Sequence, residues 1–172
     1  IMSMIDPSSL RAAFGAYMTG VTVVTARDAH GQAVGFTANS FTSVSLDPPL
    51  LLVCPGQFLS SFEAFSGCTH FAVSVLAADQ RGVADIFARH KGDRFAAVAH
   101  RFDLHDVPVI EGAVARFSCT TAKVIPAGDH VILMGEVRDA ARRNSPALGY
   151  ADGQYFDLAQ RGLASPVHAE TH

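Results

Sequence analysis

Apolar and polar residues alternate most clearly between Phe41 and Leu46. Phe41, Val44 and Leu46 are apolar, whereas the residues between them are Thr or Ser. Alternation of this kind predicts a half-exposed strand. Asp47-Pro48-Pro49 then predicts a turn, because proline fixes φ and disfavours helix in the residue before it. The following run, Leu50–Cys54, is apolar and predicts a strand buried on both faces.

Further strands are expected where apolar and β-branched residues cluster between turn residues. Val21–Thr25 is β-branched throughout, and the turn Asp28–Gly31 leads from it into a strand over Ala33–Ser45. A hairpin is expected later in the chain, around the turn Pro126–Asp129. The remaining predicted strands, two of which form that hairpin, are Phe71–Leu76, Gly112–Ile125, His130–Ala140 and Tyr150–Leu158.

Three short helices are expected. The first begins at Asp6, an N-cap candidate, has Pro7 at its first helical position and ends at Gly20. The others cover Phe62–Phe65 and Ala78–Ala88. A chain that is mainly β, with hairpin turns between its strands, favours a Greek-key-like antiparallel barrel over a doubly wound sheet.

Length and composition indicate the number of domains and the class of protein. The chain has 172 residues, of which 49% are hydrophobic and 17% charged, and this is typical of one globular domain. We expect the domain to span residues 5–158, with a flexible tail over residues 159–172. The net charge of −3 argues against a nucleic-acid surface, which would need clustered Lys and Arg.

The cysteines and histidines argue against metal or disulfide chemistry. The three cysteines are widely spaced with no C-x-x-C, and the six histidines up to His130 include no pair with the spacing of a metal hydrolase. His168 and His172 lie in the tail and are read as solvated residues. We therefore expect no metal site and predict a reducing cytoplasm as the location. No apolar run reaches the roughly 18–20 residues that span a bilayer, so no membrane association is expected.

Small polar residues provide the first candidate site. Thr37, Asn39 and Ser40 can hydrogen-bond the edge of a heterocycle, because hydroxyls and amides both donate and accept. The alternative is that they cover the outer face of an ordinary strand. The pattern alone leaves both interpretations open.

Other segments can hold an anion or deliver an imidazole. Ser60 and Ser61 precede a helix, whose free amides favour negative charge, although they can equally be an ordinary N-cap. Arg94 can pair with a phosphate or be a surface arginine. Gly128-Asp129-His130 delivers a histidine at a strand start, either as a group that positions a substrate near neutral pH or as a structural residue.

Taken together, these segments resemble the short-chain NAD(P)H-dependent flavin reductases, the reductase components of two-component flavin monooxygenases. The resemblance extends from about Leu10 to Leu158 and depends on the order and spacing of several short pieces. Those pieces are Thr19–Thr25, Gly35–Pro55, Phe71–Leu76, Asp93–Phe95, Gly128–His130 and Gly135–Val137.

The resemblance implies an FMN-binding split β-barrel, usually a homodimer with flavin near the subunit interface. It also implies roles for three sets of residues. The isoalloxazine ring and ribityl chain would be lined by Thr37, Ala38, Asn39 and Ser40. Backbone contacts to the ring edge would come from Val53, Cys54 and Pro55. The phosphate would be held by Ser60, Ser61 and Arg94.

The activity implied is NAD(P)H-dependent reduction of free FMN or FAD, which would supply reduced flavin to a separate oxygenase. His130, with Tyr155, would face the nicotinamide. We expect His130 to orient the nicotinamide and not to act as an obligatory acid, because hydride transfer to flavin needs no protein nucleophile. NADH is favoured over NADPH, since no basic side chain is obviously dedicated to a 2′-phosphate. Two alternatives stay open: a flavoprotein that keeps FMN and reduces a corrinoid or an electron-transfer partner, and a non-catalytic flavin- or haem-binding module.

Overall fold

Strands make up most of the chain, as its alternating pattern predicts. The computed structural model describes residues 4–157. Its strands are β1 (Thr19–Gly20), β2 (Thr22–Arg27), β3 (Ala33–Ala38), β4 (Thr42–Leu46), β5 (Pro49–Val53), β6 (His70–Val75), β7 (His100–Phe102), β8 (Pro108–Ile110), β9 (Ala115–Ala127), β10 (His130–Arg142), β11 (Leu148–Ala151) and β12 (Gln154–Asp157). Its helices are α1 (Pro7–Gly15), α2 (Phe62–Gly67), α3 (Arg81–Arg89) and the short 3-10 turns η1 (Ala78–Gln80) and η2 (Phe95–Ala97).

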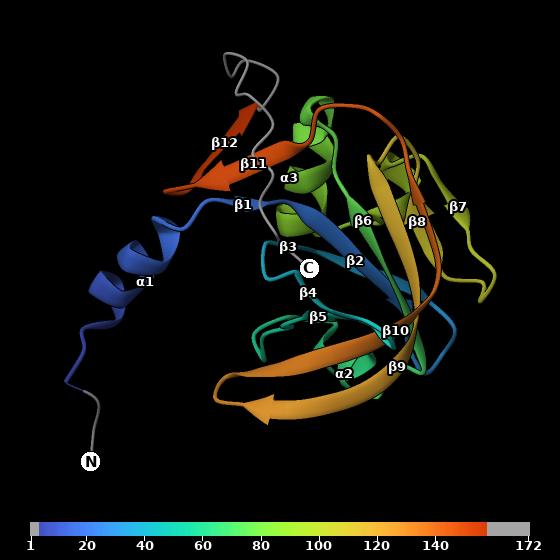
Figure 1. The fold of residues 1–172 in the computed structure, drawn as a ribbon, viewed down its shortest axis with the longest axis horizontal. Coiled ribbons are helices and arrows are strands. Elements are labelled where there is room, and N and C mark those ends of the chain that lie inside the picture. Colours follow the sequence, from blue (N-terminus) through green and yellow to red (C-terminus); the bar gives the residue numbers. More distant parts are fainter. Residues whose placement is uncertain (1–3, 158–172) are drawn as a thin grey trace.

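A seven-stranded antiparallel sheet forms the body of the molecule. Its strand order is β3-β2-β6-β9-β10-β5-β4, so β3 and β4 are its two edges. These edge strands are consecutive in sequence and only residues 39–41 separate them. The sheet must therefore curl until its edges meet, which gives the split barrel of Figure 1. The predicted mainly-β, antiparallel barrel is confirmed.

Two hydrophobic clusters lie on the two sides of β2. Side chains alternate across a strand, so Val24 and Ala26 enter the cluster inside the barrel, whereas Val23 faces a second cluster beneath α3. The inner cluster is Val24, Ala26, Phe36, Ala38, Leu51, Val53, Phe65, Phe71, Val73, Cys119 and Leu133. The outer one is Val21, Val23, Leu76, Ala84, Phe87, Val98, Ile110 and Leu148.

The prediction that Leu50–Cys54 is buried on both faces was wrong. Leu51 and Val53 are in the core, but Leu50 and Leu52 are only half-buried. In contrast, β2 is buried on both faces, because α3 and β11 cover its outer side. Runs of apolar residues thus did not distinguish a doubly covered strand from one whose outer face is covered only in part.

Element boundaries also differ from the predictions. The first helix ends at Gly15, and Thr19–Gly20 already pairs with β11. The segment Ala33–Ser45 is two strands, because the chain crosses between sheet edges at residues 39–41. The last predicted strand is a hairpin of β11 and β12 around Asp152-Gly153, both at positive φ, and its final residue, Leu158, lies outside the described residues. The β7–β8 hairpin was not predicted.

The first helix stands away from the barrel (Figure 1). Asp6 caps it as predicted, because its carboxylate accepts a hydrogen bond from the Ser9 amide at 3.1 Å. None of the nine residues of α1 is buried against the described chain. Within residues 4–157, no helix is long and apolar enough to cross a membrane.

Gly135 permits close packing inside the barrel. A Cβ at this position would lie 2.7 Å from Cys119 Cβ and would overlap the ring of the fully buried Phe71. We expect Gly135→Ala to lower the free energy of unfolding by about 1–3 kcal/mol, the usual cost of overpacking. Urea denaturation followed by circular dichroism measures this loss.

Gly82→Ala is the matched control. A Cβ there meets nothing within 4 Å, and the residue lies in α3, where alanine is the better helix former. This variant should be as stable as the wild type or slightly more stable. Equal midpoints for the two glycine variants would contradict the packing argument.

Candidate functional site

Two neighbouring pockets share the end of β3. Their volumes are about 250 Å³ and 190 Å³, and both are lined by Thr37, Ala38 and Asn39. The shared segment leads directly into residues 39–41, where the two edges of the sheet meet. The structure therefore places the predicted polar segment at a cleft and not on an ordinary outer strand face.

Aromatic residues of the terminal hairpin form the wall of the larger pocket. Tyr150 and Tyr155 lie 5.5 Å apart between ring centroids, and Arg89 faces them from the last turn of α3. Arg81 holds the hairpin in place, because its guanidinium lies over the Tyr155 ring at 5.6 Å and donates to the Tyr155 carbonyl at 3.0 Å. Burial raises the pKa of the Tyr155 phenol, so this group stays protonated at neutral pH.

The smaller pocket combines an apolar wall with an imidazole. Leu59 and Cys54 line it, and so do Phe58 and His130, whose rings meet edge to face with centroids 5.9 Å apart. Phe58 is 80% exposed, which is unusual for a phenylalanine. An exposed aromatic ring beside a half-exposed histidine is well suited to contact a planar ligand.

A hydrogen bond at Nδ1 fixes the orientation of the His130 imidazole. Nδ1 lies 2.6 Å from the Asp129 carboxylate, and this hydrogen bond lowers the pKa of Asp129. A carboxylate only accepts, so Nδ1 carries the proton and Nε2 is left for a ligand. The backbone also holds the segment, since Gln57 donates its amide to the Asp129 carbonyl at 2.9 Å.

The three small polar residues differ in what they can still bind. Thr37 donates its hydroxyl to the Ala84 carbonyl at 2.6 Å, and Ser40 accepts the Cys54 amide at 3.0 Å. Within the described part of the chain, no hydrogen bond engages the Asn39 side chain, which is exposed and lines both pockets. Asn39 is therefore the residue best able to recognise a polar ligand edge.

The residues expected to contact phosphate lie outside both pocket linings. Ser60 and Ser61 follow Leu59, and neither makes a side-chain cap to α2. Arg94 donates from Nη1 to the Gly35 and Phe87 carbonyls and from Nε to the His90 carbonyl, each at 2.8 Å. It thus ties the end of α3 to β3, and only Nη2 remains for a phosphate.

The three residues expected to contact the ring edge through their backbone already use part of that backbone in hydrogen bonds within the protein. Val53 is fully buried and pairs with Leu133. Pro55 accepts the Val131 amide at 3.0 Å, and the Cys54 amide is bound to Ser40. Of these three predicted residues, Cys54 lines a pocket. His130 and Tyr155, expected to face one ligand together, line different pockets on either side of Thr37–Asn39.

Sequence reasoning missed Phe58, Arg89 and Tyr150. Phe58 carries a signal that could have been used, because a large apolar residue between Gly56 and Ser60 has no strand or helix to bury it. Arg89 and Tyr150 belong to elements that become neighbours of β3 only in the folded barrel. No local pattern marks such residues.

Cys54 and Cys119 should differ in reactivity. Burial raises the pKa of Cys54, which lines a pocket, and raises that of Cys119, in the core, to about 12. Since the thiolate is the reactive form, Cys54 alkylation by iodoacetamide should be slow at pH 7 and accelerate by up to about tenfold per pH unit through pH 9. Cys119 should stay unmodified in the folded protein.

Peptide mass spectrometry after timed quenching measures these rates. Protein unfolded in urea is the control, because all three cysteines should then react alike. Alkylation of Cys54 at pH 7 as fast as that of a free cysteine peptide would show that its thiolate is not suppressed.

Comparison with known proteins points to one family. The model of the flavin reductase like domain matches residues 14–159. The reductase component of a flavin-dependent trigonelline monooxygenase from Acinetobacter baylyi is 48% identical over 151 residues, which cover 88% of this chain and 49% of that protein. The chain thus spans about half the length of that relative. FMN reductase (NADH) SmoA from Agrobacterium fabrum is 47% identical over 147 residues, which cover 86% of this chain and 83% of that protein.

A solved structure agrees with these sequence matches. NADH:FAD oxidoreductase SgcE6 of Streptomyces globisporus C-1027, in complex with NAD and FAD fragments, superposes with a TM-score of 0.83. The sequences are 37% identical, and the match covers 96% of this chain and 99% of that one. Family model, sequence relatives and structure coincide over nearly the whole described fold, and the chain belongs to the flavin reductase like family.

Proposed function

We propose that this protein reduces free flavin, FMN or FAD, at the expense of NADH or NADPH and supplies the reduced flavin to a separate oxygenase. The observation that carries the proposal is the side-chain amide of Asn39. It has no hydrogen-bond partner among the described residues and lines both pockets, in a chain of the flavin reductase like family. Relatives named as an FMN reductase (NADH), an NADH:FAD oxidoreductase and a monooxygenase reductase component support it.

The cleft suits a flat ligand with a polar edge. Asn39 offers both a donor and an acceptor, and Thr37 keeps lone pairs free after its one donated hydrogen bond. Leu59, Phe58 and the tyrosine wall provide apolar surface around them. These residues would hold the isoalloxazine ring, with Ala38, Ser40 and Cys54 beside it. When bound, flavin accepts a hydride from reduced nicotinamide, and the protein supplies orientation and keeps competing reactants out.

In this proposal His130 is a positioning residue for the nicotinamide. Asp129 fixes the imidazole tautomer and leaves Nε2 for a polar group of the ligand. Tyr155 forms the wall of the other pocket, and Ser60, Ser61 and Nη2 of Arg94 are the proposed phosphate contacts. NADH remains the preferred donor. Arg89, which lines the larger pocket, is the basic side chain to examine if NADPH is also used.

The test is steady-state oxidation of NADH and NADPH with FMN and with FAD, four combinations on the purified chain. We expect saturable turnover with added flavin, and more efficient turnover with NADH. Flavin that copurifies tightly while added flavin turns over poorly would favour a dedicated acceptor, a corrinoid or an electron-transfer partner. If neither nucleotide is oxidised with either flavin, the reductase proposal fails and a flavin- or haem-binding module remains.

Two variants separate the residue roles. Asn39→Ala should raise the KM for flavin by about tenfold, because the variant loses one hydrogen bond to a buried ligand edge. His130→Ala should lower kcat/KM for NADH and leave flavin KM nearly unchanged. Ser43→Ala, an exposed polar residue of β4 outside both pockets, is the control. An unchanged kcat/KM for NADH in His130→Ala would remove the proposed role of that residue.

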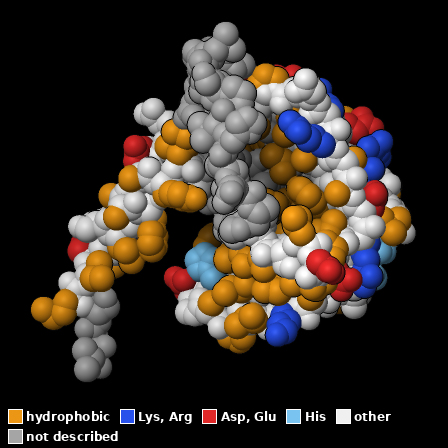
Figure 2. All heavy atoms as spheres, viewed as in Figure 1, with side chains coloured by type: hydrophobic (Ala, Val, Ile, Leu, Met, Phe, Trp, Pro, Cys, Tyr) orange, Lys and Arg blue, Asp and Glu red, His pale blue; other side chains and the backbone are white. Residues whose placement is uncertain are grey.

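We also propose that the protein is a homodimer. Leu10, Phe14 and Tyr17 expose 39%, 71% and 79% of their surface on or just after α1, and Val44 and Leu46 of β4 are exposed too. Hydrophobic side chains run along this helix in Figure 2. Apolar surface of this extent is typical of an interaction site. The resemblance to flavin reductases, which implies a homodimer, supports a second copy of the chain as the occupant.

Phe14→Glu should dissociate the dimer, because it places a charge in the apolar stripe. Size-exclusion chromatography with light scattering measures the mass directly. Ala12→Glu is the control, since a residue two positions away lies on the opposite face of the helix. A monomeric wild type, or equal masses for the two variants, would contradict this interface.

A reducing compartment, the cytoplasm, is the proposed location. Cys54, Cys68 and Cys119 are all free thiols. A cytoplasmic protein has no need of disulfides, whereas secreted proteins commonly pair their cysteines. Reduced nicotinamide nucleotides, the proposed electron donors, support the same location.

A further inference from the structure

A third pocket, of about 340 Å³, lies at the other end of the β9–β10 hairpin. Its walls come from β7, the link between β8 and β9, and the ends of the two hairpin strands. Four of the 13 Lys and Arg residues of the chain line it, although the net charge of the chain is −3. These are Arg101, Arg116, Arg142 and Arg143.

Two of the four guanidinium groups are already held in place. Arg143 donates from Nε to the Ala113 carbonyl at 3.2 Å and from Nη2 to the Gly112 carbonyl. Arg116 donates from Nη1 to the Asp139 carboxylate at 2.9 Å. Because these side chains are fixed before any ligand arrives, less rotamer entropy is lost when they bind one.

The other two are uncommitted. Among the described residues, no hydrogen bond or ion pair engages the guanidinium of Arg101 or of Arg142, and both residues are exposed. In addition, the Nε of Arg116 is buried and has no hydrogen-bond partner in the described chain. A charged donor buried without a partner carries an energetic cost.

The charges in this pocket are not balanced by its own residues. Glu111 is the single carboxylate among the described lining residues, and Asp139 lies beside Arg116 outside the lining. Clustered like charges repel one another in the free protein. The N–H donors of a guanidinium group fit the paired oxygens of a phosphate or carboxylate group, and this pocket offers several guanidinium groups at once.

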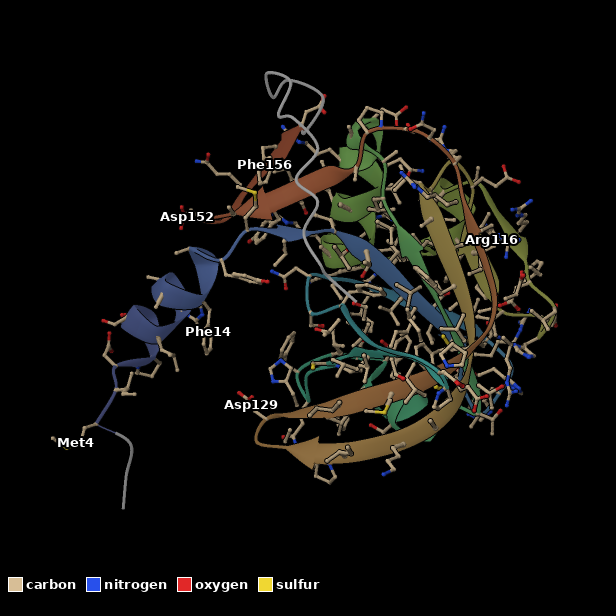
Figure 3. The ribbon with its side chains drawn as sticks, viewed as in Figure 1. Met4, Phe14, Arg116, Asp129, Asp152 and Phe156 are labelled. Carbon is tan, nitrogen blue, oxygen red and sulfur yellow. The ribbon has the colours of Figure 1, made fainter. Side chains whose placement is uncertain are left out.

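This pocket is separate from the cleft described above. It shares no lining residue with the two pockets around Asn39. His130 begins β10 and Arg142 ends it, so the two lie about 40 Å apart along the strand. Figure 3 shows Asp129 and Arg116 at opposite ends of the β9–β10 hairpin.

We propose that the arginine pocket is a second binding site, for a small molecule that carries at least two adjacent phosphate groups. Its concave form and volume match those of small-ligand sites, and two uncommitted guanidinium groups can bind one phosphate while the two fixed ones receive the other. The site is separate from the cleft around Asn39, and its ligand is not a substrate of that cleft.

Isothermal titration of the full chain with inorganic pyrophosphate tests the proposal. We expect one site per chain, weakened as salt rises, and weakened at least about tenfold by the double substitution Arg101→Gln and Arg142→Gln, which removes charge-assisted hydrogen bonds. Lys123→Gln, the same change of charge at an exposed position of β9, should bind like the wild type. Asn39→Ala should also leave pyrophosphate affinity unchanged.

Two further titrations define the ligand. ADP distinguishes a nucleotide source of the diphosphate from the free anion, and citrate distinguishes carboxylates from phosphates. The proposal is overturned if pyrophosphate does not bind the wild type, if the double variant binds as tightly, or if Asn39→Ala abolishes binding. Citrate binding as tight as that of pyrophosphate would also overturn the phosphate assignment. Unchanged circular dichroism of the double variant establishes that it is folded.

Discussion

A link of three residues, 39–41, joins the two edge strands of the seven-stranded sheet, and the architecture follows from it. Four Cα–Cα steps separate Ala38 from Thr42, so the edges approach within at most about 14 Å of each other. Five other strands lie between those edges in the sheet. The sheet can satisfy both conditions only by coiling into a barrel that is left split along this seam.

The seam is also where the cleft forms. Ser40 accepts the Cys54 amide across it, so the link is tied to the end of β5 by a side chain instead of a strand ladder. The backbone of the link is therefore free of regular strand pairing, and the side-chain amide of Asn39 is available to a ligand. The two pockets on either side use residues from α3, the terminal hairpin and the start of β10, all brought to the seam by barrel closure.

The β9–β10 hairpin gives the molecule two chemically different ends. Near Gly128 it presents Asp129 and His130 beside the cleft, and its opposite end carries Arg116 and Arg142 of the third pocket. Its strands run through the centre of the sheet, with β6 on one side and β5 on the other. Pairing with strands on both sides makes the middle of this hairpin a rigid support for the residues at its two ends.

Local pattern determined most of the strands, the Asp6 cap, the polar segment Thr37–Ser40 and the turn that delivers His130, because each depends on neighbours in sequence. The order and spacing of short segments also indicated the family. Only the tertiary structure decided that β2, and not β5, is buried on both faces, since coverage by α3 is a long-range contact. It likewise showed that Arg94 binds three carbonyls, that His130 and Tyr155 line separate pockets, and that four arginines from distant segments converge. Hydrogen-bond partners and shared cavities depend on which strands become neighbours, and that is set by the closure of the sheet.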